Sequence, residues 1–224
     1  MRPMRNASTT VRIFAIVPAA GRSERMGRAK QLLDVGGRPM LLAVLEPLLA
    51  SDVAGVVLVT QRVIAEQLGL SREGKGGLPF QRRVRDSDAG KLVVAYNDNE
   101  SAEMIDSIRI GLRTWRERTL IADRDGFLVC PADQPGIATA DFNACIAAFR
   151  AAPDRIVIAA RAGRRGHPLV FAAALAAFVE SAACDGGLHA LPHAHADRVT
   201  LVECSSPGVT RDVDTPADWG ERPR

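Results

Sequence analysis

The sequence has no long run of apolar residues, although 47% of its 224 residues are hydrophobic. A membrane-spanning helix needs about 20 consecutive, mostly apolar residues, so we expect no such helix. Residues 1–10 also lack the apolar centre of a secretory signal, and we expect them to form a disordered tail. These absences predict a cytoplasmic protein that has no membrane partner.

Cysteine is scarce, and its four positions lie far apart in the chain. There is no Cys-x-x-Cys pair, and no histidine stands beside a cysteine at the spacing of a zinc site. We therefore expect free thiols in a reducing compartment. The positions are Cys130, Cys145, Cys184 and Cys204.

The charge balance has little excess of either sign, with 29 basic and 26 acidic residues and a net charge of +3. A nucleic-acid surface needs clustered Lys and Arg rather than a small surplus, so we expect no nucleic-acid partner. One basic, Gly-rich stretch at 71–90 is interpreted as a solvated loop, and a site for an anionic partner stays open there. The length favours one domain, at 11–224, without an internal boundary.

Short apolar runs rich in β-branched residues recur along the chain and predict buried strands. Helical patterns alternate with these runs, and the first of them places Met104, Ile105, Ile108 and Leu112 on one face. This alternation predicts a single-domain α/β fold with a mostly parallel sheet and helices on both faces. Ligands of such folds bind at the carboxyl ends of the strands. The predicted strands are 11–18, 55–60, 91–96, 126–130, 155–160 and 198–204, and the predicted helices are 101–115, 139–151 and 172–183.

The loop after the first predicted strand has the composition of a phosphate site. Small residues at 19–21 allow a close backbone approach, and N–H groups in such a turn can bind phosphate oxygens. Arg25 and Lys30 add cationic groups that suit a triphosphate. The patterns G-x-x-x-x-G-K-S/T and G-x-G-x-x-G are both absent, so spacing alone leaves an ordinary surface loop as the alternative.

Two acidic segments follow further along the chain. Asp133 ends a predicted strand between two prolines, and a carboxylate there suits Mg²⁺ together with substrate phosphates. The alternative role for Asp133 is a turn or a helix N-cap. The second segment holds Asp212, Asp214 and Asp218, where Asp212 or Asp218 could instead cap the last helix.

These segments resemble the MobA-like nucleotidyltransferases. The family's signature is similar to Ala-Ala-Gly-x-Ser-x-Arg-Met-Gly-x-x-Lys at 19–30, and its acidic motifs are similar to Asp-Gln-Pro at 133–135 and Asp-Val-Asp-Thr-Pro-Ala-Asp at 212–218. The resemblance extends over about residues 12–219. It implies a Rossmann-like nucleotidyltransferase fold, a nucleoside triphosphate substrate, Mg²⁺, and a phosphorylated small-molecule acceptor.

The resemblance also implies roles for individual residues. Arg25, Lys30 and Asp133 correspond to the catalytic positions, and Asp133 with Asp214 corresponds to the metal site. His167, in the stretch Gly163–Phe171, is expected to face the acceptor. The nucleotide-binding positions implied by the resemblance are Ala19, Ala20, Gly21, Arg22, Ser23, Arg25, Lys30, Asn97 and Ser107.

Two further stretches narrow the branch of the family. Residues 163–171 and 184–188 resemble motifs of the molybdenum cofactor cytidylyltransferases, which implies CTP, molybdopterin as the acceptor, release of pyrophosphate, and a molybdoenzyme or its chaperone as a possible partner. Ala20 stands where guanylyltransferases of this group have Gly, which favours CTP over GTP. Methylerythritol-phosphate cytidylyltransferases have a similar opening but different acidic motifs.

The sequence also departs from the family pattern. Glu100 and Glu103 replace an aromatic residue and a glycine in the pocket segment, so these carboxylates either point to solvent or alter the pocket. Two other functions therefore stay open: a nucleotidyltransferase for a sugar phosphate or another phosphorylated small molecule, and a non-catalytic protein that holds a nucleotide or pterin for delivery. His189 and His193 are expected on a polar helix surface rather than at a metal.

Overall fold

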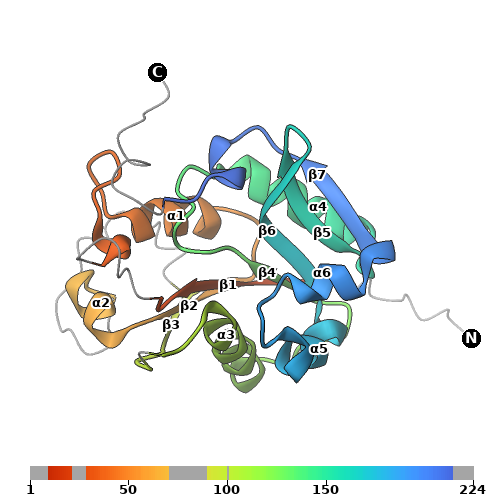
Figure 1. Cartoon of the computed structure of the whole chain (residues 1–224), viewed down its shortest axis with the longest axis horizontal. Coiled ribbons are helices and arrows are strands. Elements are labelled where there is room, and N and C mark those ends of the chain that lie inside the picture. Colours follow the sequence, from red (N-terminus) through yellow and green to blue (C-terminus); the bar gives the residue numbers. More distant parts are fainter. Residues whose placement is uncertain (1–9, 22–28, 71–89, 100, 214–224) are drawn as a thin grey trace, which may run out of the picture.

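The computed structural model describes residues 10–21, 29–70, 90–99 and 101–213. Within these ranges, seven strands form one sheet in the order β3-β2-β1-β4-β6-β5-β7 (Figure 1). Every neighbouring pair is parallel except the two that involve β6, which confirms the predicted mostly parallel sheet. The strands are β1 (Ile13–Ala19), β2 (Gly55–Thr60), β3 (Leu92–Tyr96), β4 (Gly126–Val129), β5 (Ile156–Arg161), β6 (Arg164–Ala172) and β7 (Val199–Glu203).

Helices cover both faces of the sheet, as the sequence predicted. In Figure 1, α1 and α4 lie above the sheet, and α3, α5 and α6 lie below it. No helix in the described ranges is both long enough and apolar enough to cross a membrane. The helices are α1 (Met40–Leu49), α2 (Arg62–Gln67), α3 (Met104–Arg118), α4 (Thr139–Ala151), α5 (Ala176–Glu180) and α6 (Ala190–Ala194).

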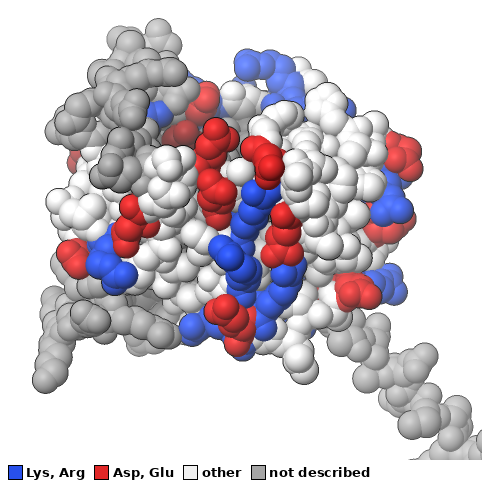
Figure 2. Space-filling model, turned by 60° about the horizontal axis from the view of Figure 1, so that its bottom comes forward, with Lys and Arg blue, Asp and Glu red and all other residues white. Residues whose placement is uncertain are grey.

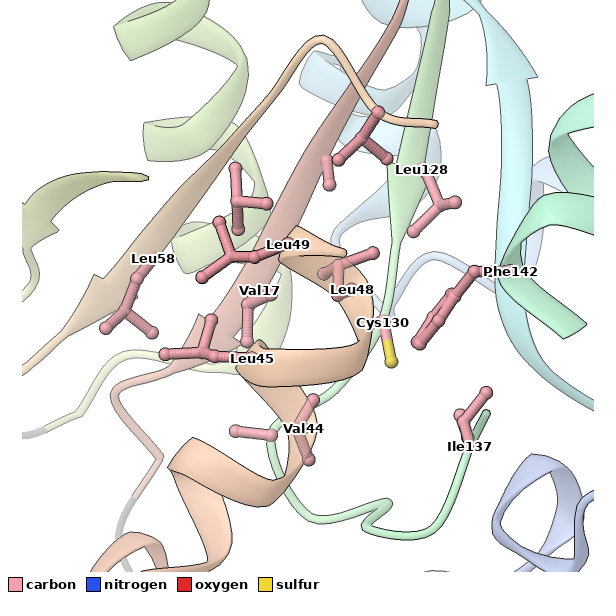
Figure 3. Close-up of a cluster of buried hydrophobic side chains, with 14 of the residues drawn as sticks. Val17, Val44, Leu45, Leu48, Leu49, Leu58, Leu128, Cys130, Ile137 and Phe142 are labelled. Atoms are coloured by element: carbon pink, nitrogen blue, oxygen red, sulfur yellow. The ribbon is translucent and has the colours of Figure 1, made fainter. Parts of the chain in front are cut away.

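The central strands are apolar on both sides because each face of the sheet carries its own core. Successive side chains of a strand point to opposite faces, so Ala15 and Val17 of β1 join the core under α1 and α4, whereas Phe14 and Ile16 join the core over α3. Figure 3 shows Leu45, Leu48 and Leu49 of α1 packed above β1 and β2. Continuous apolar strands of this kind are typical of parallel sheets.

Helix α3 lies unusually close to β1. A Cβ atom on Gly111 would come within 2.5 Å of the Ile16 side chain, so the helix can approach the strand only because this residue has no side chain. One turn further on, the Trp115 indole donates a hydrogen bond of 3.0 Å to the Ala15 carbonyl. These contacts fix the height and direction of α3 against the sheet.

Ion pairs also join α3 to the connection between β6 and β7. Arg109 donates to the Ser181 carbonyl at 2.8 Å and to the Asp185 carboxylate at 2.7 Å. Arg116 makes a two-pronged contact with Glu180, with both N–O distances at 2.8 Å. Figure 2 shows basic and acidic side chains interleaved on this face of the molecule. The 173–198 connection is therefore attached to α3.

The structure differs from the sequence-based prediction at three places. Strand β6 was not predicted, because its N-terminal half is polar and contains Pro168, which has no N–H to donate to the hydrogen bonds of a sheet. Pro168 is tolerated because the pairing with β5 shifts register between its partners 165 and 169. The predicted helix at 172–183 is broken by Ser181, whose backbone is extended. Met104 is not on the buried face of α3, since 48% of it is exposed.

Asp141, near the start of α4, fixes the segment that follows β7. The carboxylate is 5% exposed and accepts hydrogen bonds of 3.1 Å from the backbone N–H groups of Ser205 and Ser206. Burial alone would raise the pKa of the Asp141 carboxyl, but the hydrogen bonds from Ser206 and Ser205 outweigh it and hold that pKa below its usual value of 3.8. The ionised carboxylate thus holds residues 205 and 206 against α4.

The variant Asp141→Asn should lower the free energy of unfolding at pH 7 by about 1–3 kcal/mol, because an amide can replace only one of the two accepting oxygens. The folded-state pKa lies below the unfolded one, so the carboxylate stabilises the wild type above about pH 4 and loses this effect as the pH falls through the folded-state pKa. The variant should therefore lose less stability on acidification. Urea unfolding from pH 7 to pH 2.5 measures both effects. The exposed Asp154→Asn is the control, and equal stability of Asp141→Asn and wild type at pH 7 would refute this role.

Candidate functional site

A first cleft of about 110 Å³ opens at the carboxyl ends of β1 and β4. These strands are parallel neighbours, so the loops that follow them meet at the same edge of the sheet. The cleft lies between the loop after β1, the residues after β4, and the first turn of α3. Its lining residues are Pro18, Ala19, Ala20, Gly21, Lys30, Gln31, Met40, Met104, Ser107, Pro131, Ala132 and Asp133.

Three side chains donate hydrogen bonds to the backbone carbonyls of residues 19–21, at the end of β1 and the start of the loop that follows it. The buried Gln31 amide donates to the Ala19 carbonyl at 2.7 Å and to the Gly21 carbonyl at 3.3 Å. The Thr60 hydroxyl also reaches Ala19, at 3.3 Å, and the Gln61 amide reaches the Ala20 carbonyl at 3.2 Å. In a trans peptide the N–H points opposite to the carbonyl, so the N–H groups of Ala20 and Gly21 point away from these side chains. Such N–H groups suit an anion.

The wall opposite this loop is built on another polar contact. Ser107 lines the cleft on α3, and the Asn97 amide donates to its hydroxyl at 3.1 Å. Both side chains are buried, at 6% exposure for Asn97 and 2% for Ser107. Asn97 itself is bound to β2 through its backbone N–H, which donates to the Thr60 carbonyl at 3.0 Å. The structure thus brings Asn97 and Ser107 together, with Ser107 nearer the cleft.

Asp133 lines the first cleft on the segment that follows β4. Its backbone carbonyl accepts a hydrogen bond of 2.9 Å from the N–H of Val213, so Val213 is held beside it. Burial first, and the Asp133 charge second, raise the pKa of the nearby Cys130 thiol well above its usual range. Cys130 is therefore a protonated core residue, and the carboxylate is the chemical group at this strand end.

A second cleft of about 560 Å³ adjoins the first. The two share Met104, and the chain passes from one to the other between Asp133 and Gln134. Its walls are mostly apolar and carry several polar groups from four separate parts of the chain. The lining residues are Met104, Ile105, Val129, Gln134, Ile158, Arg165, Gly166, His167, Leu169, Gly187, Leu188, His189, Pro192, His193, Thr210 and Asp212.

Two residues of the second cleft hold buried hydrogen-bond acceptors. Burial lowers the pKa of His167, against the opposing effects of a hydrogen bond to the Val129 backbone and of the Asp212 charge, so the neutral imidazole is favoured. Its Nδ1 atom and the Oε1 atom of Gln134 have no hydrogen-bond partner within the described ranges. Because unsatisfied buried acceptors are rare, this part of the cleft suits a ligand that donates hydrogen bonds.

Two glycines allow three segments beside the second cleft to pack closely. A Cβ atom on Gly166 would collide with the Val209 carbonyl, and one on Gly208 would lie 2.5 Å from the Pro135 carbonyl. Strand β6, the turn at 207–210 and the residues after Asp133 therefore meet backbone to backbone. This contact sets His167 and Asp212 on the same cleft.

The structure brings together several residues that the sequence predicted for one site. Ala19, Ala20, Gly21, Lys30, Ser107 and Asp133 surround the first cleft, and His167 lines the second. The predicted residues Arg22, Ser23, Arg25 and Asp214, the departure at Glu100, and the basic stretch after residue 70 lie outside the described residues.

Other sequence interpretations can be checked directly. Glu103 is exposed at the N-cap of α3 and lines neither cleft. Of the two alternatives given for this carboxylate, it therefore points to solvent and does not alter the pocket. His189, at the N-cap of α6, and His193, within α6, are both exposed, as expected of a helix surface, and they also line the second cleft. No group of three or more metal-binding side chains occurs in the described part of the chain, and the four cysteines are free and buried.

Sequence reasoning did not assign Gln31, Met104, Gln134, Arg165 or Asp212 to the clefts. Gln31 and Gln134 stand inside the motifs, next to Lys30 and Asp133, and this adjacency was the available signal. Arg165 likewise stands inside the 163–171 motif, two residues before His167. Nothing in the sequence marks Met104 for the clefts, because its position depends on contacts between distant segments.

Several known proteins resemble this chain over most of its length. Residues 15–199 match the model of the MobA-like NTP transferase domain. The purine catabolism protein PucB of Bacillus subtilis (strain 168) is 23% identical over 215 residues, which cover 92% of this chain and 94% of that protein. A 2-C-methyl-D-erythritol 4-phosphate cytidylyltransferase of Frankia casuarinae is 52% identical over 56 residues, or 24% of this chain and 19% of that enzyme.

Among solved structures, Rv0371c from Mycobacterium tuberculosis H37Rv has a TM-score of 0.68 at 24% identity, with 94% of this chain and 96% of that chain covered. A structure of Rv0371c in complex with manganese has a TM-score of 0.63 and 23% identity, and covers 93% of this chain and 96% of that chain. At this level of identity the likeness establishes a common fold.

The variant Gln31→Glu should displace the loop after β1, because a carboxylate oxygen would then face the Ala19 carbonyl where an N–H now donates. We expect a loss of about 1–3 kcal/mol in the free energy of unfolding and a weaker stabilisation of the protein by nucleoside triphosphates. Chemical denaturation and thermal shift measure the two effects. Gln67→Glu is the matched control, since Gln67 is exposed on α2 and lines neither cleft. Equal effects of both changes would contradict the anchoring role of Gln31.

The variant Gly166→Ala should separate β6 from the turn at 207–210, because the new methyl group meets a backbone carbonyl that cannot move alone. A loss of about 1–3 kcal/mol in stability is expected from such overpacking. Gly90→Ala is the control, since nothing lies within 4 Å of its Cβ position. Urea unfolding compares them, and a Gly166→Ala protein as stable as Gly90→Ala would show that the close contact is not needed.

Proposed function

Since the chain belongs to the MobA-like NTP transferase family and is a nucleotidyltransferase, we propose that it transfers the CMP unit of CTP to the phosphate of molybdopterin. Pyrophosphate is the second product. The observation that carries this proposal is the pair of adjoining clefts, which meet at Met104 and at the Asp133–Gln134 peptide. A transferase of this kind has to hold two substrates side by side.

The first cleft takes the nucleotide in this proposal. The N–H groups of Ala20 and Gly21, turned outward by Gln31 and Gln61, bind phosphate oxygens, and Lys30 contributes a positive charge to the same cleft. The sequence motif adds Arg22, Ser23 and Arg25 to this set. Asn97 and Ser107 form the opposite wall, toward the nucleoside.

Asp133 is proposed to hold Mg²⁺, with Asp214 as a second ligand, because its chain neighbour Val213 is hydrogen-bonded to the Asp133 carbonyl. A carboxylate that lines a phosphate cleft fits a hard cation, which takes one or two protein carboxylates and completes its shell with phosphates and water. When bound, the ion offsets the negative charge of the phosphates. The manganese complex of Rv0371c is a precedent for a divalent ion in this fold.

The second cleft takes the acceptor. A phosphate oxygen of the acceptor attacks the α-phosphorus of CTP, the bond to the β-phosphate oxygen breaks, and pyrophosphate leaves. Little acid-base chemistry is needed, because the nucleophile is already an oxyanion at neutral pH. The protein contributes the alignment of the two reacting groups and the stabilisation of charge.

Two observations support CTP. Ala20 adds a methyl group to the nucleotide loop where guanylyltransferases of this group have Gly, and the matched Frankia casuarinae protein is a cytidylyltransferase by name. The resemblance of the 163–171 segment to the cytidylyltransferases of the molybdenum cofactor supports molybdopterin as well. In the second cleft, His167 and Gln134 offer hydrogen-bond acceptors between apolar walls. A flat ring with N–H donors, such as a pterin, fits that combination.

The direct test is pyrophosphate release by the purified protein with molybdopterin and Mg²⁺, compared for CTP, GTP, ATP and UTP. CTP should be used best, and the product should contain CMP linked to the acceptor by a pyrophosphate bond. Turnover with a sugar phosphate but not with molybdopterin would keep the reaction type and overturn the acceptor. No turnover with any nucleotide and either acceptor would reject the proposed reaction.

Asp133→Asn should reduce turnover by about a hundredfold or more, because the neutral amide is a poor ligand for Mg²⁺ and no longer offsets its charge. The fold should persist, since the change is isosteric. Initial rates of pyrophosphate release over a Mg²⁺ titration provide the measurement, with the exposed Asp123→Asn as the control. Retention of full activity by Asp133→Asn would exclude it as the metal ligand.

A further inference from the structure

Met104 is an apolar side chain left at the surface of the site. It is 48% exposed, although its neighbours on α3, Ile105, Ser107 and Ile108, are each no more than 3% exposed. Packing of the core does not require a large apolar residue at this position. An exposed methionine at a binding surface is typical of a contact with a ligand, because its unbranched side chain adapts to the shape of its partner.

The backbone that carries Met104 is held in place by hydrogen bonds near the start of α3. The N–H of Glu103 donates to the Asp106 carboxylate at 2.9 Å, which closes the first turn of α3. Ser107 is bonded to Asn97, and Arg109 attaches the helix to the Ser181 carbonyl. The position of the Met104 side chain is therefore fixed at its base, while its outer atoms can rearrange.

Met104 also occupies the boundary between the two clefts. Of the residues that the structure describes, it is the one that lines both of them. On the segment after β4 the boundary falls between Asp133, which lines the first cleft, and Gln134, which lines the second. Ligands held in the two clefts would both lie beside Met104.

We propose that Met104 contacts both substrates at once and keeps water away from the reacting phosphorus. The inference rests on the proposed nucleotidyl transfer and assigns it a residue that neither the motifs nor the family resemblance mark. In the normal reaction an acceptor phosphate oxygen bonds to the α-phosphorus as pyrophosphate leaves. In the unwanted reaction a water oxygen forms that bond instead, pyrophosphate leaves in the same way, and the water proton passes to solvent, which produces CMP.

An apolar side chain suits this place because it supplies neither a nucleophile nor a proton. A shorter side chain at position 104 would let water pass between the two clefts. It would also remove a surface against which both substrates pack. Misplacement of reacting groups by a small distance lowers the rate of transfer strongly. The loss should therefore appear for both substrates and as leakage to water.

The test compares Met104→Ala, Met104→Leu and, as a matched control, Leu120→Ala, which truncates a side chain that is 91% exposed away from both clefts. CTP with Mg²⁺ is supplied with and without molybdopterin, and CMP, pyrophosphate and the joined product are quantified. For Met104→Ala we expect a higher KM for both CTP and molybdopterin and a roughly tenfold larger share of CMP among the products. Met104→Leu should stay near the wild type, and Leu120→Ala should match it.

Each outcome decides the inference. A Met104→Ala protein with wild-type KM values and an unchanged share of CMP would overturn it, while the nucleotidyl transfer would stand. A rise in KM for one substrate alone would also overturn it, since the residue would then serve a single cleft. If the wild type joins CMP to another acceptor but not to molybdopterin, the choice of acceptor is wrong. The same comparison on that acceptor then decides the inference, because an unchanged KM and share of CMP for Met104→Ala would overturn it there too. If the wild type transfers nothing to any acceptor, the proposed function fails and the inference fails with it.

Discussion

The parallel pairing of β1 with β4 is the constraint around which the site is arranged. Because their carboxyl ends meet at one edge, the loop after Ala19 and the carboxylate of Asp133 come together although they are more than a hundred residues apart in the chain. The loop is then held from behind by the amide of Gln31, and the strand end is held by the N–H of Val213. The outward N–H groups and the carboxylate thus line a common cleft.

Strand β6 adds the second cleft to this arrangement. It runs antiparallel between β4 and β5, so its N-terminal half lies at the same edge of the sheet as the carboxyl ends of these two neighbours. At this edge, Gly166 allows the 207–210 turn to approach β6 closely. Gly208, within that turn, allows the turn to approach the residues after Asp133. The two glycines therefore link the acceptor side of the site to the strand end that carries Asp133.

The fold was largely predictable because parallel strands are apolar on both sides and are recognised as short continuous runs. Six of the seven observed strands, all but β6, follow such runs, and residues 139–151 form a helix as their pattern predicted. Strand β6 escaped prediction because its exposed half is polar and Pro168 falls at a shift of register. The groups named in motifs were locatable for a similar reason, since Lys30 and Asp133 stand in short, continuous stretches of sequence. The second cleft was not, because His167, His193 and Asp212 meet only through long-range packing.

Helix α3 joins these parts because it borders both clefts and is attached to both sides of the molecule. Gly111 and Trp115 fix it to β1, while Arg109 and Arg116 fix it to the connection that carries His189 and His193. A shift of the helix along its axis would change both clefts together, since Ser107 faces one and Ile105 the other. The close contact at Gly111 opposes such a shift, so the relative placement of the two substrates is set by the packing of one helix on one strand.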